Sequence, residues 1–238
     1  MLVKTKGIVL KSLKYSETSL ILDIYTEEIG LRSCIVNGVR KAKSKTASLY
    51  QVLQILDLVI YDKDPRKLNR IKEASSAYLY QSITLDIHKT NLAIFIIDIV
   101  SNTIKEHEEN TDLFSFIEMY LRYVDKTMDS IALLSLKFML DLSSFLGFAP
   151  LDNYGLHDVY FDLEEGKFVS DNKRGNYILP LELSQHIRTV LNMEMQDVQN
   201  YSVPKAERTI LLDKMILYYK LHLTGFKDPK SLEIFRRL

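Results

Sequence analysis

The sequence predicts an α+β protein in which a small β-domain, residues 1–77, precedes a larger helical domain, residues 78–238. Apolar residues of the first part fall into short runs at roughly 10-residue spacing, joined by turn residues, which is typical of strands. From about residue 77 the apolar residues instead recur at helical spacing. The chain has 238 residues, of which 47% are hydrophobic, so it is long enough to bury a substantial core.

The strand patterns number five. The clearest alternates Leu20, Leu22 and Ile24 with residues of the opposite face. Gly7 lies inside the first run, and an Asp-Lys-Asp-Pro turn separates the last two. Five strands is the count of an OB-fold, a partly open barrel whose strand faces and loops bind oligonucleotides. We therefore predict an OB-fold barrel with strands at Val3–Leu13, Ser19–Tyr25, Leu31–Val36, Gln54–Tyr61 and Leu68–Ala74.

Helical periodicity governs most of the remaining chain. Gly147 ends one predicted helix, and Pro204 suits the first turn of another. Residues 148–178 have no helical period, and we predict a loop region there with one short hairpin, Val159–Leu163 and Lys167–Ser170. The predicted helices are Asn91–Thr103, Leu113–Val124, Ser130–Leu146, Leu181–Leu191 and Ala206–Leu223, and a short segment, Ser231–Leu238, ends the chain.

Charge is neutral only on average. The chain has 31 basic and 31 acidic side chains, but residues 1–80 contain 14 Lys and Arg against 8 Asp and Glu. The β-domain therefore has an excess of six positive charges, and the remainder has an excess of six negative ones. Such asymmetry indicates a nucleic-acid or membrane partner, or else chance segregation of charge on two solvated surfaces.

Several kinds of catalytic and cofactor site are not indicated. The eight glycines form neither a dinucleotide fingerprint nor a phosphate loop. The single cysteine, Cys34, excludes an internal disulfide framework and a multi-cysteine zinc site, and its strand position predicts that it packs in a core. The longest apolar run, Leu92–Ile97, is too short to cross a membrane, and we expect a cytoplasmic protein without cofactor or enzymatic turnover.

One acidic cluster leaves a metal-dependent alternative. Glu106, Glu108 and Glu109 flank His107 and would be the ligands of a metal-dependent nuclease or phosphatase. Consecutive side chains on a helix point in different directions, so a solvated helix end is the favoured interpretation.

The basic residues form the constellation with the clearest chemistry. The segment from Gly38 to Lys45 contains four cations in six residues, and cations that meet phosphates release condensed counterions, which drives nucleic-acid binding. Tyr15 and Tyr25 are candidates for base stacking, although core or barrel-rim positions are favoured for them. An exposed solubilising hairpin is the alternative for the loop. The candidate DNA contacts are Arg40, Lys41, Lys43 and Lys45, supported by Lys4, Lys6, Arg66 and Arg70.

Motifs across the chain resemble the recombination mediator RecO family of bacterial DNA repair proteins. The opening Lys6-Gly7-Ile8-Val9-Leu10 and the following Gly38-Val39-Arg40-Lys41 are similar to the start of that family. Later similarities are the run F-M-L-D-L-S-S-F-L-G-F-A-P at 138–150, the Tyr-Phe-Asp of 160–162, and Gly-Phe-Lys-Asp-Pro-Lys-Ser-Leu at 225–232. No single motif is specific, but together they extend over essentially the whole chain in the same order.

The resemblance implies an OB-fold with a helical domain and a non-catalytic role. Such proteins bind single- and double-stranded DNA, anneal complementary strands, and work with RecR to load RecA onto DNA coated with single-stranded DNA-binding protein. The helical domain would receive the acidic tail of that last protein, with Lys137 as the residue that pairs with the tail carboxylate, unless Lys137 is simply an exposed helix lysine.

The chain departs from the family in one respect. Many members contain a four-cysteine zinc module after the leucine-glycine-aromatic motif, whereas residues 148–178 have no cysteine. We therefore expect no zinc and a hairpin that forms without it. The competing function that remains is a non-catalytic adaptor whose basic β-domain binds an acidic protein partner.

Overall fold

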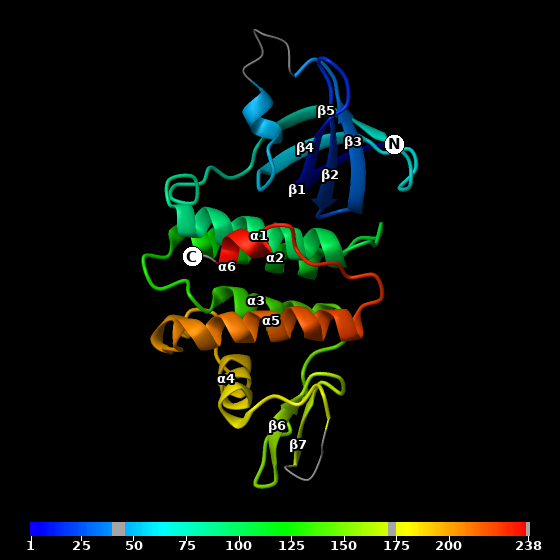
Figure 1. Ribbon diagram of the computed structural model, residues 1–238. Helices are drawn as coiled ribbons and strands as arrows, with labels where there is room; N and C mark the ends of the chain where they lie inside the picture. Colours follow the sequence, from blue (N-terminus) through cyan, green and yellow to red (C-terminus); the bar gives the residue numbers. More distant parts are fainter. Residues whose placement is uncertain (40–45, 171–174, 237–238) are drawn as a thin grey trace. The chain divides into compact units, whose positions relative to one another are not determined.

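The structure is a computed structural model that describes residues 1–39, 46–170 and 175–236 (Figure 1). It confirms the predicted α+β class. Contacts divide the chain into two compact units, Met1–Lys126 and Thr127–Leu238. The predicted domain boundary, between residues 77 and 78, lies where strands give way to helices, and it stays a prediction. The contacts instead group the first two helices with the barrel.

The five predicted strands are present and form a closed barrel. Its strand order is β1-β2-β3-β5-β4, with β4 returning to β1. Neighbouring strands are antiparallel except for the short parallel pairing of β3 with β5, which closes the barrel. The strands are β1 (Leu2–Lys14), β2 (Leu20–Thr26), β3 (Gly30–Val36), β4 (Ile55–Tyr61) and β5 (Asn69–Ser76).

Gly7 lies where β1 pairs with both of its neighbouring strands. The first half of β1 pairs with β4, and the second half pairs with β2. A Cβ atom on Gly7 would lie 2.6 Å from Ile24 Cγ2 and 2.7 Å from Leu58 Cδ1. A side chain at this position would collide with side chains of β2 and β4, so the close packing of the barrel requires the glycine inside the first predicted strand.

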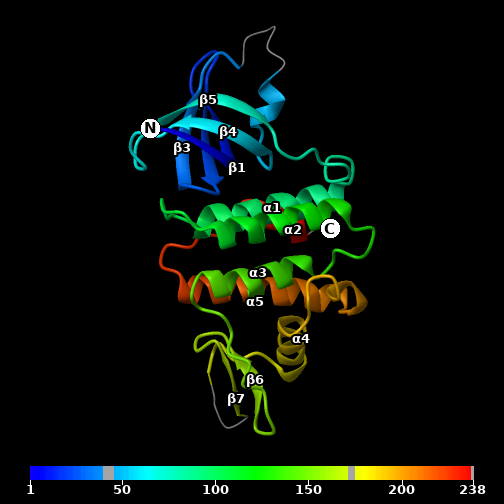
Figure 2. The same ribbon diagram turned by 180° about the vertical axis from the view of Figure 1, so that it is seen from behind.

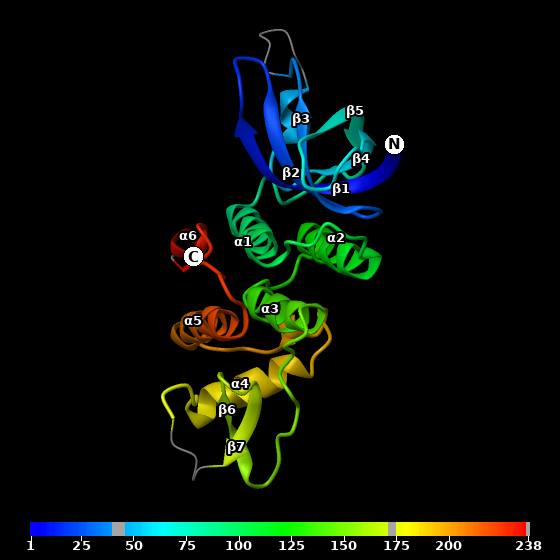
Figure 3. The ribbon, with the colours of Figure 1, turned by 90° about the vertical axis from the view of Figure 1, so that its right-hand side faces the viewer.

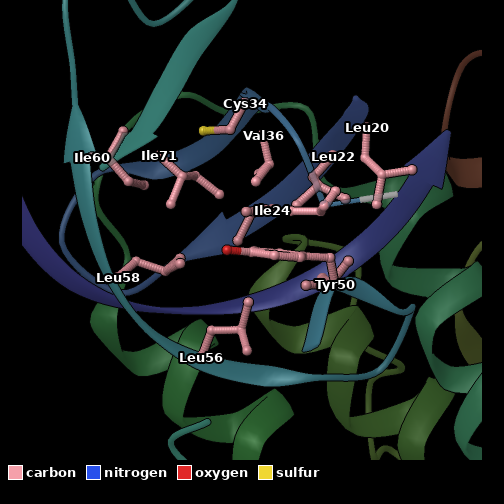
Figure 4. Close-up of a cluster of buried hydrophobic side chains, with 12 residues drawn as sticks. Leu20, Leu22, Ile24, Cys34, Val36, Tyr50, Leu56, Leu58, Ile60 and Ile71 are labelled. Atoms are coloured by element: carbon pink, nitrogen blue, oxygen red, sulfur yellow. The ribbon is translucent and has the colours of Figure 1, made fainter. Parts of the chain in front are cut away.

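The barrel core is filled from all five strands and from one short helix (Figure 4). A 3-10 helix, η1 (Ala47–Tyr50), was not predicted, because its four residues are too short to show a helical period. Its Tyr50 points in among Ile24 and Leu58. Cys34 is fully buried in the same cluster, which confirms the prediction that it packs in a core.

Helices α1 (Ile87–Thr103) and α2 (Thr111–Lys126) belong to the same unit as the barrel and lie side by side (Figure 3). Both begin before their first predicted apolar residue. The Asp86 carboxylate accepts the backbone N–H groups of His88 and Lys89, and the Asn110 side chain accepts that of Leu113. Polar residues of a first helical turn lack apolar periodicity, so the pattern alone placed both starts too late.

The second unit contains α3 (Leu134–Phe145), α4 (Leu181–Leu191), α5 (Lys205–His222) and α6 (Leu232–Arg236) (Figure 2). A short helix, η2 (Val198–Asn200), precedes α5. The predicted hairpin is present as β6 (Asp158–Asp162) and β7 (Lys167–Ser170), and α4 packs against β6. Within the described residues, every helix is too short or too polar to traverse a lipid bilayer.

Candidate nucleic-acid interface

A groove of about 520 Å³ lies beside the turn between β4 and β5. Its charged lining consists of the three cations Lys63, Arg70 and Lys72, without an acidic side chain. Tyr61 and Leu68 provide exposed apolar surface in the same groove. Because Tyr61 and Arg70 are paired across β4 and β5, an aromatic ring and a guanidinium are neighbours on the outer face of the barrel.

The turn that borders this groove is braced by Asn69, which is almost fully buried. Its side-chain amide donates to the carbonyl oxygens of Asp64 and Lys67 at 3.0 and 3.1 Å, and its Oδ1 accepts the Lys63 N–H at 3.0 Å. The Asp64 carboxylate in turn accepts the Arg66 N–H at 3.0 Å. These bonds fix the backbone, so the side chains of Lys63, Arg66 and Lys67 extend into solvent.

Electrostatics also order the turn. The N–H of Arg66 and the ammonium of Lys67 hold the pKa of the exposed Asp64 carboxyl below its ordinary value. Lys67 Nζ lies 3.3 Å from Asp64 Oδ2, so part of its charge is balanced locally. Arg66 has no ion-pair partner within the part of the chain that the structure describes, and its charge is available to a ligand.

A buried ion pair anchors the start of the turn. Arg32, on β3, donates through Nε to Asp62 Oδ1 at 2.9 Å and through Nη1 to the His107 carbonyl at 2.8 Å. Arg32 was counted with the positive charge of residues 1–80, but its side chain is only 5% exposed. It is therefore a structural cation, and the net charge of the sequence overstates the charge that a ligand can reach.

The structure separates the predicted DNA contacts. Arg70 lines the groove, and Arg66 lies on its bordering turn. Lys6 Nζ instead lies 3.4 Å from Glu118 Oε2 on α2. Lys4 lines a different hollow of about 420 Å³ that also contains Asp57 and Glu73. Arg40, Lys41, Lys43 and Lys45 lie outside the described residues.

The chain on either side of the basic segment is fixed in the barrel. Val39 and Tyr50 are both buried in the core cluster, with exposed fractions of 5% and 6%. Asn37 Oδ1 accepts a hydrogen bond from Ser19 Oγ at 3.0 Å, which joins the end of β3 to the start of β2. The basic segment is thus attached to the barrel at both ends.

The two tyrosines proposed from the sequence differ in position. Tyr25 is 1% exposed and packs against Phe114 of α2, with ring centroids 6.1 Å apart. Burial raises the pKa of Tyr25 to about 12, with a smaller contribution from the Glu106 charge. The favoured core position of Tyr25 is confirmed, whereas Tyr15 is exposed in the β1–β2 turn.

Tyr61 and Lys63 are not among the candidate contacts that the sequence predicts. The sequence predicts Tyr61 only as the last residue of a strand, although it lies next to a basic turn. An exposed aromatic residue at a strand end beside several cations was the available signal. Its orientation depends on strand register, which places Ile60 in the core and Tyr61 outside.

Lys137 is not an exposed helix lysine. It is 6% exposed, and its Nζ donates to Asp141 Oδ1 at 2.7 Å, one turn later on α3. To bind a carboxylate from another protein, the Lys137 ammonium would have to contact that carboxylate together with Asp141 or break its bond to Asp141.

The acidic cluster after α1 does not converge on a metal. Glu106, Glu108 and Glu109 are exposed, and they lie in an irregular segment after α1 rather than within its last turn. The Glu106 carbonyl accepts the Leu31 N–H at 3.1 Å, so this segment packs against β3 through its backbone. Within residues 1–39, 46–170 and 175–236, no three His, Cys, Asp or Glu side chains gather closely enough to hold a metal ion.

The strand order and the helical region that follows define a protein with an N-terminal OB-fold-like domain. Residues 1–80 match the family model "Recombination protein O N terminal", and residues 84–233 match "Recombination protein O C terminal". The chain belongs to the RecO family of DNA repair proteins.

Named relatives agree over the full length. The chain is 33% identical to DNA repair protein RecO of Christiangramia forsetii over 242 residues, which covers 100% of this chain and 99% of that protein. It is 34% identical to the proteins of the same name from Flavobacterium johnsoniae and Bacteroides fragilis, again over 100% of this chain and 99% of each relative. These matches support a role in DNA repair.

Proposed function

We propose that the protein binds single- and double-stranded DNA, anneals complementary strands, and with RecR helps to load RecA onto DNA coated with single-stranded DNA-binding protein. The observation that carries the proposal is the groove beside the β4–β5 turn, whose lining contains three cations and no acidic side chain. The proposed role involves no catalytic turnover, and it would place the protein in the cytoplasm, at the nucleoid during repair.

The cations are proposed to act through phosphates. Lys63 and Arg70 have no ion-pair partner among the described residues, whereas Lys72 lies 3.0 Å from Glu73 and is partly balanced. Each phosphate that meets an unbalanced cation releases condensed counterions, so DNA affinity should fall as salt rises. Arg40, Lys41, Lys43, Lys45 and Arg66 are proposed as further contacts, and the pairing of Lys6 and the acidic neighbours of Lys4 make those two weaker ones.

The first experiment measures single-stranded DNA affinity against salt concentration. The variant K63A/R70A should weaken binding for all base sequences and reduce the slope of log affinity against log salt by about 0.7 per lost contact. The matched control K227A/K230A removes the same charge from exposed positions of the second unit. Unchanged affinity and slope in K63A/R70A would refute this groove as a DNA site.

A second experiment tests the partner role. Strand annealing is measured with DNA that is bare, coated with single-stranded DNA-binding protein, or coated with its tail-deleted form. K137A should slow annealing only on DNA coated with the intact protein, because only that form presents the acidic tail. K137A that anneals all three substrates at the wild-type rate would remove Lys137 from the proposal.

The adaptor alternative predicts different binding. An acidic peptide would compete with DNA regardless of strand length, whereas a DNA-binding surface gains affinity as the strand lengthens and covers more cations. Length-independent affinity would favour the adaptor. Incubation of the protein with DNA and Mg²⁺ tests the nuclease alternative, and cleavage would contradict a non-catalytic role.

A further inference from the structure

We infer that the groove beside the β4–β5 turn is a subsite for one unstacked base of single-stranded DNA, in which Tyr61 stacks on the base while the neighbouring cations contact the flanking phosphates. This inference rests on the proposed DNA binding and deepens it. It assigns separate roles to the aromatic ring and to the cations, so the two can fail independently.

The Tyr61 ring is available for stacking. Its side chain is on the outer face of β4, and the residue is 38% exposed. Within the described part of the chain, its hydroxyl has no hydrogen-bond partner and its ring contacts no other aromatic ring. A tyrosine that only filled the core would resemble Tyr25, which is buried and packed against Phe114.

The apolar and charged parts of the groove suit the two parts of a nucleotide. Tyr61 and Leu68 form an apolar surface that can cover the faces of a base. Arg70 is the cross-strand partner of Tyr61, Lys72 follows two residues later on the same face of β5, and Lys63 begins the turn. The ring is therefore bordered by cations on β5 and on the turn, as a base is bordered by phosphates along its strand.

The groove is also held in shape. Asn69 fixes the turn from the inside with three hydrogen bonds, and the Arg32–Asp62 ion pair fixes the residue next to Tyr61. A surface that is ordered before binding loses less conformational entropy when the ligand arrives.

Stacking provides a means of distinguishing single strands from duplexes. Every base has a π-face, so stacking on an aromatic ring tolerates all sequences. In a duplex those faces are covered by neighbouring bases, and only the phosphates remain accessible to the groove. Tyr61 should therefore contribute to the affinity for single strands alone, whereas the cations contribute to both.

The test compares Y61A, Y61F and the control L156A, which removes a large exposed apolar side chain from the second unit. Fluorescence anisotropy with labelled DNA measures the affinity for a single strand, for a blunt duplex, and for a strand with abasic sites. Loss of one stacked base corresponds to a roughly 5- to 150-fold loss of affinity. We expect that loss for Y61A on the single strand, with the salt slope unchanged, because no charge is removed.

The remaining variant and DNA substrates separate the loss of stacking from other causes of weaker binding. Y61F should bind like the wild type, since phenylalanine retains the ring and should retain the fold. On the duplex and on the abasic strand, the affinities of Y61A and of the wild type should differ by less than about twofold. Wild-type affinity of Y61A for single strands, or an equal loss on duplex and abasic DNA, would overturn the inference. If K63A/R70A weakens binding while Y61A does not, the proposed function stands and the stacking subsite fails.

Discussion

Arg32 and Asp62 form a buried ion pair that joins β3 to the first residue after β4, with Nε and Oδ1 2.9 Å apart. The guanidinium also donates to the carbonyl groups of Leu31 and His107. One side chain thereby connects two barrel strands and the segment that precedes α2. The same pair positions the turn beside the candidate groove, so barrel stability and the proposed DNA binding both depend on a residue outside the groove lining.

Replacing Arg32 should therefore reduce both properties. R32A leaves the Asp62 carboxylate buried without its partner, which costs about 3–5 kcal/mol of unfolding free energy. Urea unfolding measures that loss, and single-stranded DNA affinity should fall because the turn is no longer fixed. The matched control K67A breaks the exposed Lys67–Asp64 pair and should cost at most about 1 kcal/mol. Equal stability of the two variants would contradict a structural role for Arg32.

Gly7 should not tolerate a methyl group. In G7A the new Cβ would lie 2.6 Å from Ile24 Cγ2 and 2.7 Å from Leu58 Cδ1, well inside van der Waals contact. Overpacking of this kind costs about 1–3 kcal/mol, measured as a loss of unfolding free energy. G155A is the control, because its Cβ would meet nothing closer than the Asn153 carbonyl oxygen at 3.8 Å. If G7A is as stable as G155A, the barrel side chains around residue 7 can move aside for a methyl group, and the prediction is wrong.

Asp125 should stabilise the first unit in a pH-dependent way. Its buried carboxylate accepts backbone N–H groups from Gln81, Ser82 and Ile83 at distances between 2.8 and 3.0 Å. Burial alone would raise the pKa of Asp125, but these bonds and the Tyr78 hydroxyl outweigh it and lower the pKa. The stabilisation is therefore present above the ordinary pKa of aspartate and is lost as pH falls through the lowered value.

The variant D125N tests this. At neutral pH it should lose about 1.5–3 kcal/mol, because hydrogen bonds to a charged acceptor are replaced. The difference between D125N and wild type should shrink in acid, where the wild-type carboxylate becomes protonated. The control D152N changes an exposed aspartate and should leave the unfolding free energy nearly unchanged. A D125N deficit that is constant with pH would refute the electrostatic part of this account.

Cys34 should be inert in the folded protein and destabilising at high pH. Burial, followed by the Asp62 charge, raises the pKa of Cys34 from 9.0 to about 12. The folded state retains the proton that the unfolded state loses, so the stability that the neutral thiol contributes is full below about pH 9 and declines toward pH 12. A thiol-reactive dye should label Cys34 only after denaturation, and C34A should lack the part of the alkaline decline that Cys34 causes. Rapid labelling of the native protein would contradict the buried position.

Side-chain hydrogen bonds and ring packing hold the hairpin of the second unit in place. Asn153 pairs with β7 as a strand would: its side chain donates to the Phe168 carbonyl and accepts the Phe168 N–H, both at 2.8 Å. On the other side of the hairpin, Ser184 Oγ on α4 accepts the Phe161 N–H at 2.9 Å. Phe161 and Phe168 also pack together, with ring centroids 5.2 Å apart. The absence of cysteine was evident in the sequence, but this set of contacts was not.

Local pattern determined much of the fold. The alternation around Leu22 and Ile24 specified a strand, and helical spacing specified α4 with its observed bounds, Leu181–Leu191. Cys34 was correctly assigned to the core, since its position in the strand alternation is local information. The starts of α1 and α2 were placed too late because the caps Asp86 and Asn110 act through side-chain geometry rather than periodicity.

The accessible charge, by contrast, was decided by tertiary structure. The sequence counts Arg32, Lys6 and Arg70 as equal cations, but the fold buries the first, pairs the second with Glu118 and exposes the third in a groove. Those differences arise between residues that are 30 and 112 positions apart in the chain. Periodicity and composition report which residues a segment contains, whereas desolvation and charge pairing depend on which distant segments meet.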